Sequence, residues 1–331
     1  MSRLADTPLS VLDLAPIREG GAIADTFRES VALAQHTEAL GYTRYWLAEH
    51  HGIEGIASAA TAVLIGHVAG ATQRIRVGSG GIMLPNHPPL VVAEQFGTLE
   101  TLYPGRIDLG LGRAPGSDGP TMAALRRDPH AGVDDFPKRL SELQGFLEEA
   151  RPGQRVRAVP GQGTRVPIWL LGSSDFSARL AAREGLPFAF AAQFAPARLL
   201  EALRVYRDNF QPSAMLDRPH AMVGLPVIAA DSDLQADYLA STARRKFLGL
   251  IRGAPGRALP PTETLDWSPR EQAQVEQFLE AAVIGGPETV REGLEHFLAL
   301  TSADELMLHT DVYAAEDRLR SYELVAEAWR A

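Results

Sequence analysis

Short apolar runs alternate with longer amphipathic stretches along almost the whole chain, and this alternation limits the possible folds more than any other feature. The runs expected to form strands are 9–14, 43–48, 75–83, 107–111, 166–171, 188–192, 221–229 and 305–309. The stretches expected to form helices are 24–40, 58–70, 90–102, 136–150, 176–184, 196–210, 287–300 and 315–329. Strict alternation indicates parallel strands joined by right-handed crossovers. Eight strands with eight helices predict one α/β domain over residues 1–331, a (β/α)8 TIM barrel with inserted loops.

The composition excludes several classes of protein. The chain has 331 residues, 45% of them hydrophobic, which is enough for a large core. It contains no cysteine, so disulfides, thiolate chemistry and cysteine-ligated zinc are excluded. A net charge of -9 without a Lys/Arg cluster argues against a nucleic-acid partner. The polar amino terminus and the lack of a long apolar run predict a cytoplasmic protein with no membrane partner.

Two stretches interrupt the alternation. Residues 114–135 are rich in Gly, Pro and Asp, residues 250–269 are rich in Gly and Pro, and both are expected to be long loops. Loops of this length inside a compact domain often serve function, for example as lids over a site. The alternative is a solvated insertion without a role.

The strand predicted over 43–48 ends in Glu49, His50 and His51. Ligands of such a barrel bind at the carboxyl ends of the strands, and imidazole suits proton transfer near neutral pH. The alternative is that these groups only cap the strand. A metal site is a further alternative, with His87 and His309 as additional ligands. Because adjacent strand residues point to opposite faces, we expect no metal.

Two other strand ends carry features of a cofactor site. Glycines within 78–81, Gly80 and Gly81 among them, could let a flat ligand approach the backbone, although a bulge or tight packing would also explain them. Gly172, Ser173 and Ser174 enter a predicted helix that carries Ser177. A helix start with hydroxyl groups is a plausible anion site, and simple N-capping is the alternative. Arg113 at the end of the neighbouring strand favours a phosphate.

The run Gly110-Leu-Gly112-Arg113 is superficially similar to a dinucleotide-binding fingerprint. That motif needs a helix directly after its second glycine. Pro115 and Gly116 forbid one, so we do not expect a Rossmann domain.

Taken together, these motifs resemble those of the bacterial-luciferase-like flavin monooxygenases over essentially the whole chain. The resemblance is carried by Tyr45-Trp-Leu-Ala-Glu-His-His51, Val77-Gly-Ser-Gly-Gly-Ile-Met-Leu-Pro85, Tyr103-Pro-Gly-Arg-Ile-Asp-Leu-Gly-Leu-Gly-Arg113, Trp169-Leu-Leu-Gly-Ser-Ser174 and Ile284-Gly-Gly-Pro-Glu-Thr-Val290. Their order and spacing are specific for the family and not for a substrate. The family fold is a (β/α)8 barrel.

The resemblance implies an FMN-dependent oxidoreductase that uses reduced FMN and O2 to oxygenate a small organic substrate. It also implies a separate flavin reductase as transient partner and a homodimer. His50 matches the family's catalytic histidine, which would move a proton while a neighbour such as Glu49 orients it beside the flavin ring. Gly80-Gly81 matches a non-prolyl cis peptide behind the ring. Residues 250–269 match the mobile lid of luciferase, which would exclude water.

By the same resemblance, Arg113, Ser173, Ser174 and Ser177 would bind the phosphate, with Gly172 in the same turn. Two positions depart from luciferase. Gly112 replaces its reactive cysteine, so we do not expect bioluminescence. Gly172 replaces a glutamate, so we do not expect an aldehyde substrate.

Three other functions stay open at this point. The same barrel could use a deazaflavin for hydride transfer without oxygen chemistry. It could bind flavin without catalysis, although storage would not need Glu49 and His50. A barrel without flavin, such as a metal-dependent hydrolase, is the third.

Overall fold

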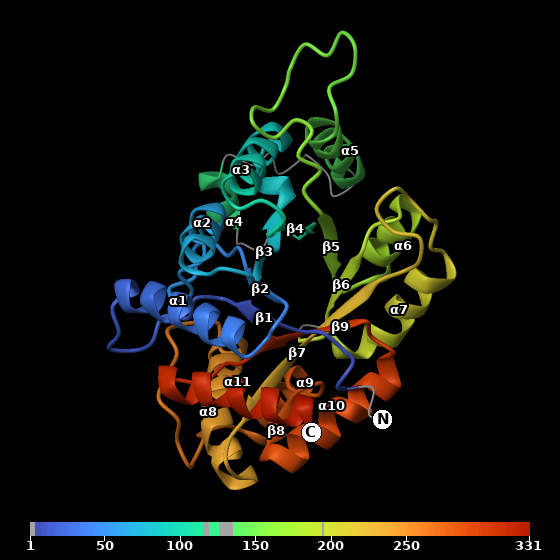
Figure 1. Ribbon diagram of the computed structural model, residues 1–331. Coiled ribbons are helices and arrows are strands. Elements are labelled where there is room, and N and C mark those ends of the chain that lie inside the picture. Colours follow the sequence, from blue (N-terminus) through green and yellow to red (C-terminus); the bar gives the residue numbers. More distant parts are fainter. Residues whose placement is uncertain (1–3, 115–118, 126–134, 194) are drawn as a thin grey trace.

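Eight parallel strands close into a ring, as Figure 1 shows. The computed structural model describes residues 4–114, 119–125, 135–193 and 195–331. Within this part of the chain, neighbouring strands pair in the order β6-β5-β4-β3-β2-β1-β9-β7, and β6 also pairs with β7. That last pairing, with Phe188 opposite Ala221, closes the barrel. The predicted (β/α)8 TIM barrel is therefore confirmed.

The predicted barrel strands differ from the observed ones by at most two residues at either end. The observed strands are β1 (Leu9–Asp13), β2 (Arg44–Leu47), β3 (Arg76–Met83), β4 (Ile107–Gly112), β5 (Ile168–Gly172), β6 (Phe188–Ala191), β7 (Ala221–Ala229), β8 (Val283–Gly285) and β9 (Glu305–His309). The short β8 pairs only with β7, outside the ring, and was not predicted.

The helices surround the ring of strands. They are α1 (Ile23–Ala39), α2 (Thr61–Ala71), α3 (Pro89–Leu102), α4 (Gly119–Ala124), α5 (Phe136–Leu147), α6 (Asp175–Glu184), α7 (Leu199–Asp208), α8 (Asp233–Ile251), α9 (Pro269–Phe278), α10 (Pro287–Thr301) and α11 (Ala315–Arg330), with 3-10 turns at Leu84–Asn86 and Pro196–Arg198. No described helix has the length and apolar character needed to cross a bilayer.

Three helices were missed by the sequence prediction. The 19-residue α8 begins after Ser232, whose hydroxyl accepts a hydrogen bond from the backbone N–H of Gln235. The shorter α9 begins with a capping box between Ser268 and Glu271. Both starts are recognisable in the sequence. The third, α4, lies within 114–135, where 115–118 and 126–134 are outside the described residues, so the prediction of one continuous loop there is wrong.

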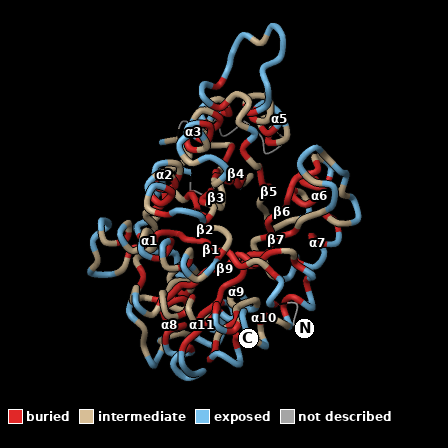
Figure 2. The backbone as a smooth tube through the Cα atoms, viewed as in Figure 1, coloured by how far each residue is buried: buried red, intermediate tan, exposed pale blue. Residues whose placement is uncertain are grey.

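Successive side chains of each strand point to opposite faces of the sheet, so they contribute to two separate cores. Figure 2 shows the buried strands inside a shell of helices. In β2, Tyr45 and Leu47 pack outward in the large core between sheet and helices. Trp46 and Ala48 belong to a second cluster with side chains from across the ring. The other members of that cluster are Leu12, Leu14, Trp169, Ala189, Met222 and Met307. The barrel interior is therefore filled at mid-height, and a ligand can only bind at one end.

The segment 250–269 is held against the loops that follow β1 and β2. The backbone of Ala258 exchanges hydrogen bonds with Ile17 and Glu19, and the Arg257 guanidinium forms an ion pair with Glu54 at 3.1 Å. On its other side, the Thr242 hydroxyl of α8 donates to the Leu259 carbonyl. The segment thus lies at the carboxyl end of the barrel, where the sequence comparison placed a lid. Its predicted mobility stays a prediction.

A buried ion pair fixes the end of β1 to α11. Asp13 is fully buried and accepts hydrogen bonds from Arg318, Tyr45, Ser30 and the Ala15 backbone N–H. Burial alone would raise the pKa of Asp13, but Arg318 and the hydroxyl groups hold it below its usual range. The buried charges of Asp13 and Arg318 therefore stabilise each other.

We expect Asp13→Ala to destabilise the protein by about 3–5 kcal/mol, because Arg318 would be left buried without a counter-charge. The matched control is Asp231→Ala, which removes an exposed partner of Arg320 on the same helix and should cost less than about 1 kcal/mol. Urea unfolding measures both. Equal losses in the two variants would contradict a structural role for the buried pair.

Candidate active site

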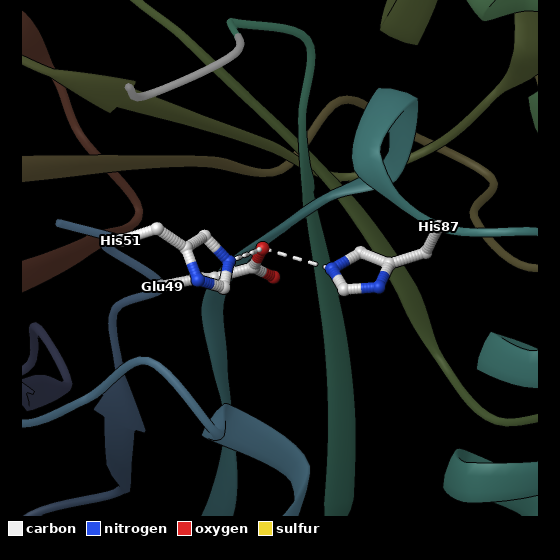
Figure 3. Close-up of side chains that lie close together, drawn as sticks. All are labelled: Glu49, His51 and His87. Atoms are coloured by element: carbon white, nitrogen blue, oxygen red, sulfur yellow. Dashed lines mark hydrogen bonds and ion pairs between the residues drawn. The ribbon is translucent and has the colours of Figure 1, made fainter. Parts of the chain in front are cut away.

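Three consecutive titratable residues, Glu49, His50 and His51, follow β2, and they do not share the same partners. Glu49 is 1% exposed, and its Oε1 accepts a hydrogen bond from Nε2 of His51 and another from Nε2 of His87, both at 2.8 Å. Its Oε2 accepts from the Met83 backbone N–H at 3.1 Å. Figure 3 shows the two imidazoles converging on one carboxylate. The expectation that Glu49 orients His50 is corrected: the carboxylate holds His51 and His87 instead.

These contacts determine the protonation of the cluster. Burial alone would raise the pKa of Glu49, but the hydrogen bonds from His87, His51 and Met83 keep it below its usual range. The carboxylate is therefore ionised and accepts from both rings. We infer that it fixes both histidines with a proton on Nε2, which ties the end of β2 to the turn after β3.

Glu49, His51 and His87 also form the one set of three potential metal ligands found among the described residues, with ligand atoms within 4.8 Å of one another. His50 does not belong to this set, and the convergence of His87 was anticipated as a possibility. All three ligand atoms already serve as donors or acceptors within the cluster. The prediction that the protein has no metal stays a prediction.

His50 is also close to charges that come from α8 and from the end of β9, which lies two strands away from β2 in the ring. Lys246 of α8 lies 2.5 Å from Asp311 Oδ2, and His309 Nε2 lies 3.5 Å from the same oxygen. The other ring nitrogen of His309 is 3.2 Å from the Leu12 carbonyl. Burial and the Lys246 ammonium lower the pKa of His50 to about 4, while Glu49 acts in the opposite direction. His50 is therefore a neutral imidazole at physiological pH.

Between β2 and β4, glycines bring the backbone of β3 close to the barrel interior. A Cβ added at Gly80 would lie 2.7 Å from Leu12 Cδ1 and 3.2 Å from Trp46 Cβ, and one at Gly81 would lie 2.7 Å from the Gly110 carbonyl oxygen. No larger residue fits these positions without displacement, and the strand register shifts between Ser79 and Ile82, so the alternative of a bulge with tight packing is present here. The Gly80-Gly81 peptide is cis, as the family resemblance implied.

Arg113 and the start of α6 lie together, as predicted. The Arg113 guanidinium lies 4.1 Å from the centre of the Phe176 ring, in the first turn of α6. Within the described ranges, no carboxylate forms an ion pair with Arg113. Ser174 occupies the N-cap position, yet its hydroxyl accepts no capping hydrogen bond. The alternative of simple N-capping therefore loses support, and these groups are available to an anion.

Gly172 and Ser177 have a packing relation that the sequence did not indicate. A Cβ at Gly172 would lie 2.5 Å from Ser177 Oγ, and Ser177 itself is buried. Gly172 is thus needed so that the first turn of α6 can pack on the end of β5. Ser177 lies beneath the turn, whereas Ser173 and Ser174 are half-buried at its surface.

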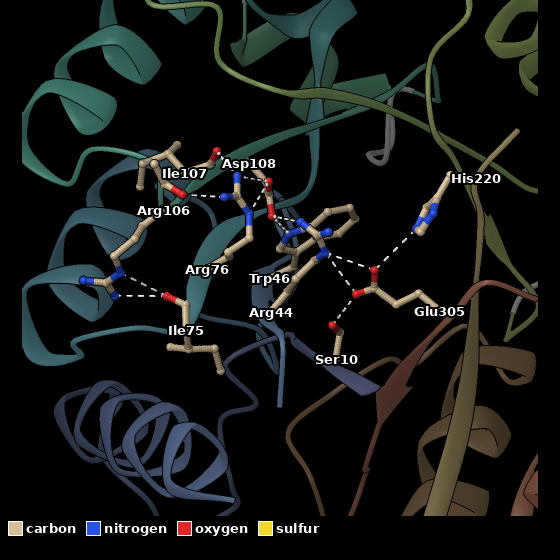
Figure 4. A network of polar contacts seen from close by, with 11 residues as sticks. Ser10, Arg44, Trp46, Ile75, Arg76, Arg106, Ile107, Asp108, His220 and Glu305 are labelled. Atoms are coloured by element: carbon tan, nitrogen blue, oxygen red, sulfur yellow. Dashed lines mark hydrogen bonds and ion pairs between the residues drawn. The ribbon is translucent and has the colours of Figure 1, made fainter. Parts of the chain in front are cut away.

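A second polar cluster lies at the opposite, amino-terminal end of the barrel, as Figure 4 shows. Arg44 bridges Asp108 at 2.7 Å and Glu305 at 3.0 Å, and Arg76 also binds Asp108. Ser10 donates to Glu305. Asp108 and Glu305 are fully buried and paired with arginine, which is typical of a structural network. We assign this end to stability rather than to catalysis.

The comparisons with known proteins agree with this arrangement. The sequence model of the luciferase-like monooxygenase family matches residues 8–305. The chain is 57% identical to the uncharacterized protein YvbT of Bacillus subtilis (strain 168), with 98% of this chain and 97% of that protein covered. It is 52% identical to a luciferase-like monooxygenase of Escherichia coli (strain K12), with 96% of each covered. The chain belongs to the luciferase-like monooxygenase family, a family of oxidoreductases.

Solved structures show the same fold. Apo-MsnO8 superposes with a TM-score of 0.90 at 36% identity and 98% coverage of both chains. The oxygenating constituent of 3,6-diketocamphane monooxygenase, in complex with FMN, gives 0.72 at 17% identity, covering 99% of this chain and 97% of its own. An F420-dependent secondary alcohol dehydrogenase, in complex with an F420-acetone adduct, gives 0.72 at 16%, covering 98% and 99%. The last two support the fold alone.

We expect Lys246→Met to raise the pKa of His50, because the variant loses the nearby ammonium and leaves Asp311 without its lysine partner. Lys138→Met, at the only other lysine and on the exposed face of α5, should leave it unchanged. Histidine NMR titration measures both. In the wild type, the low pKa means that the unfolded chain binds this proton more readily, so His50 costs stability as the pH falls below about 6.5. An unchanged titration in Lys246→Met would contradict the electrostatic role of Lys246.

Proposed function

We propose that this protein is an FMN-dependent monooxygenase that oxygenates a small organic molecule with O2 and does not emit light. The observation that carries the proposal is the joint placement of Arg113 and the α6 start on the same rim as His50, with the glycines of β3 between them. A phosphate at one end of that span and a flat ring along the glycines fit the available groups.

The chain's own residues perform three tasks in this proposal. Arg113 and the backbone N–H groups after Ser174 bind the phosphate, while Gly80 and Gly81 allow the ring to approach β3. His50, neutral and on the same rim, accepts or returns a proton at a ring nitrogen. The segment 250–269 limits the access of water. Reduced FMN, when bound, supplies the electrons and the reaction with O2.

Glu49 acts on His50 indirectly. By fixing His51 and His87, it holds the end of β2 in one conformation and thereby places His50 at the rim. We further propose that a separate reductase supplies the reduced FMN and that the chain forms a homodimer, as the family resemblance implies.

The alternatives differ in measurable ways. A deazaflavin enzyme, the class to which one solved structure with this fold belongs by its name, would retain the deazaflavin rather than FMN. A non-catalytic flavin-binding protein would retain FMN without consuming oxygen beyond the rate of free reduced FMN. A metal-dependent hydrolase would contain a stoichiometric metal, for which Glu49, His51 and His87 are the available ligands. We expect FMN retention, substrate-dependent oxygen consumption and no stoichiometric metal.

We expect Arg113→Ala to weaken FMN binding by roughly 10- to 100-fold, since a charge-assisted hydrogen bond contributes about 1.5–3 kcal/mol, and to leave riboflavin binding unchanged. Arg179→Ala is the matched control, because Arg179 lies on the same helix α6 and pairs with Asp175 at 3.4 Å. Flavin fluorescence measures both ligands. Equal losses for FMN and riboflavin would refute the phosphate assignment.

We expect His50→Ala to bind FMN normally and to lose roughly 10²–10⁴-fold in turnover, the range for removal of an acid–base group. His67→Ala, an exposed histidine of α2, should keep full turnover. Oxygen consumption with photoreduced FMN and a panel of small organic substrates provides the measurement. Wild-type turnover in His50→Ala would remove this residue from the mechanism.

A further inference from the structure

An open recess of about 680 Å³, solvent included, lies at the carboxyl end of the barrel beside the candidate active site. Its walls come from α8, from residues 254–259, and from the loops after β1 and β2. The residues that line it are Glu19, Glu54, Arg245, Lys246, Gly249, Ala254, Gly256, Arg257 and Leu259. The volume that a bound molecule could occupy is about 300 Å³, at the lower end of the range of small-molecule sites.

Lys246 connects this recess to His50. The same ammonium that lines the recess lies 2.5 Å from Asp311 and acts on the His50 imidazole. Arg113 and the α6 start lie at the ends of β4 and β5, the glycines on β3, and His50 at the end of β2. Continuing around the ring, β1, β9 and β7 follow, and the walls of the recess come from the loops after β1 and β2 and from α8, which follows β7. The recess and the phosphate-binding groups therefore flank His50 on opposite sides.

The positively charged side chains of the recess differ in their ion-pair partners. Lys246 is paired with Asp311, and Arg257 with Glu54 at 3.1 Å. Arg245 is half-buried, and its Nη1 donates to the Pro260 carbonyl at 2.6 Å. Among the residues that the structure describes, no carboxylate forms an ion pair with Arg245. A half-buried guanidinium that lacks a counter-charge is strongly attracted to an anionic group.

The acidic residues of the recess do not cancel this attraction. Glu54 is already paired with Arg257, and both Glu54 and Glu19 are exposed, so water and salt screen their charges. Arg245 is held by its contact with Pro260 and needs little reorganisation to bind a carboxylate.

We propose that this recess binds the carboxylate of the substrate, with Arg245 as the anchoring residue and Lys246 as the neighbouring cation. The identification of the bound carboxylate as the substrate rests on the proposed function, because it places a small organic carboxylate beside His50. The recess itself can be tested without flavin and without turnover.

The test compares carboxylates with neutral analogues of the same shape. Linear carboxylates from butanoate to octanoate and the matching primary amides are titrated into the flavin-free protein and into the FMN-loaded protein, with binding followed by calorimetry and ligand-observed NMR. For at least one chain length, the carboxylate should bind at least 10-fold more tightly than its amide. Its affinity should fall as the salt concentration rises.

Arg245→Gln should weaken the best carboxylate at least 10-fold and leave the amide and FMN unchanged. Arg244→Gln is the matched control on α8, because Arg244 is paired with Asp237 at 2.5 Å. Equal binding of every carboxylate and its amide, or equal effects of the two substitutions, would overturn the proposal. Loss of FMN binding in Arg245→Gln would also overturn it, since the recess would then serve the cofactor. A protein that binds carboxylates as expected but retains no FMN would refute the proposed function and leave the anion site intact.

Discussion

The pairing of β6 with β7 is the constraint on which the site depends. It converts an open parallel sheet into a ring, so that strands far apart in sequence end on one rim. Arg113 after β4, the turn after β5, His50 after β2 and His309 from β9 lie on one rim because their strands follow one another in the ring. The side chains of Trp46, Trp169 and Met307 fill the interior below them, which leaves the rim as the place for a ligand.

At the end of β2, three adjacent residues have different surroundings. Glu49 joins His51 and His87 in one cluster in which both carboxylate oxygens accept hydrogen bonds. Burial and Lys246 keep His50 neutral, although Glu49, His51 and His309 also act on it. The surroundings of two histidines adjacent in sequence thus differ, because the buried Glu49 carboxylate accepts a hydrogen bond from His51 and holds it together with His87.

The sequence predicts the barrel well because each strand and helix buries a patterned face. All nine residues of β7 are buried, and their apolar run is unmistakable. The cluster of Arg113 with the α6 start was also predictable, because consecutive parallel strands end side by side. The contact of Glu49 with His87 was anticipated only as a possible convergence, since His87 reaches the carboxylate from a short turn whose path no periodicity describes. Lys246 was missed because α8 was not assigned, although Ser232 and Gln235 mark its start.

A crystal structure of the protein with FMN tests the central claim most directly. The account predicts the phosphate beside Arg113 at the backbone N–H groups that open α6, the ring along Gly80-Gly81, and the His50 imidazole on the ring side of the rim. A phosphate bound at Arg245 and Arg257, or a ring that lies away from β3, would contradict it.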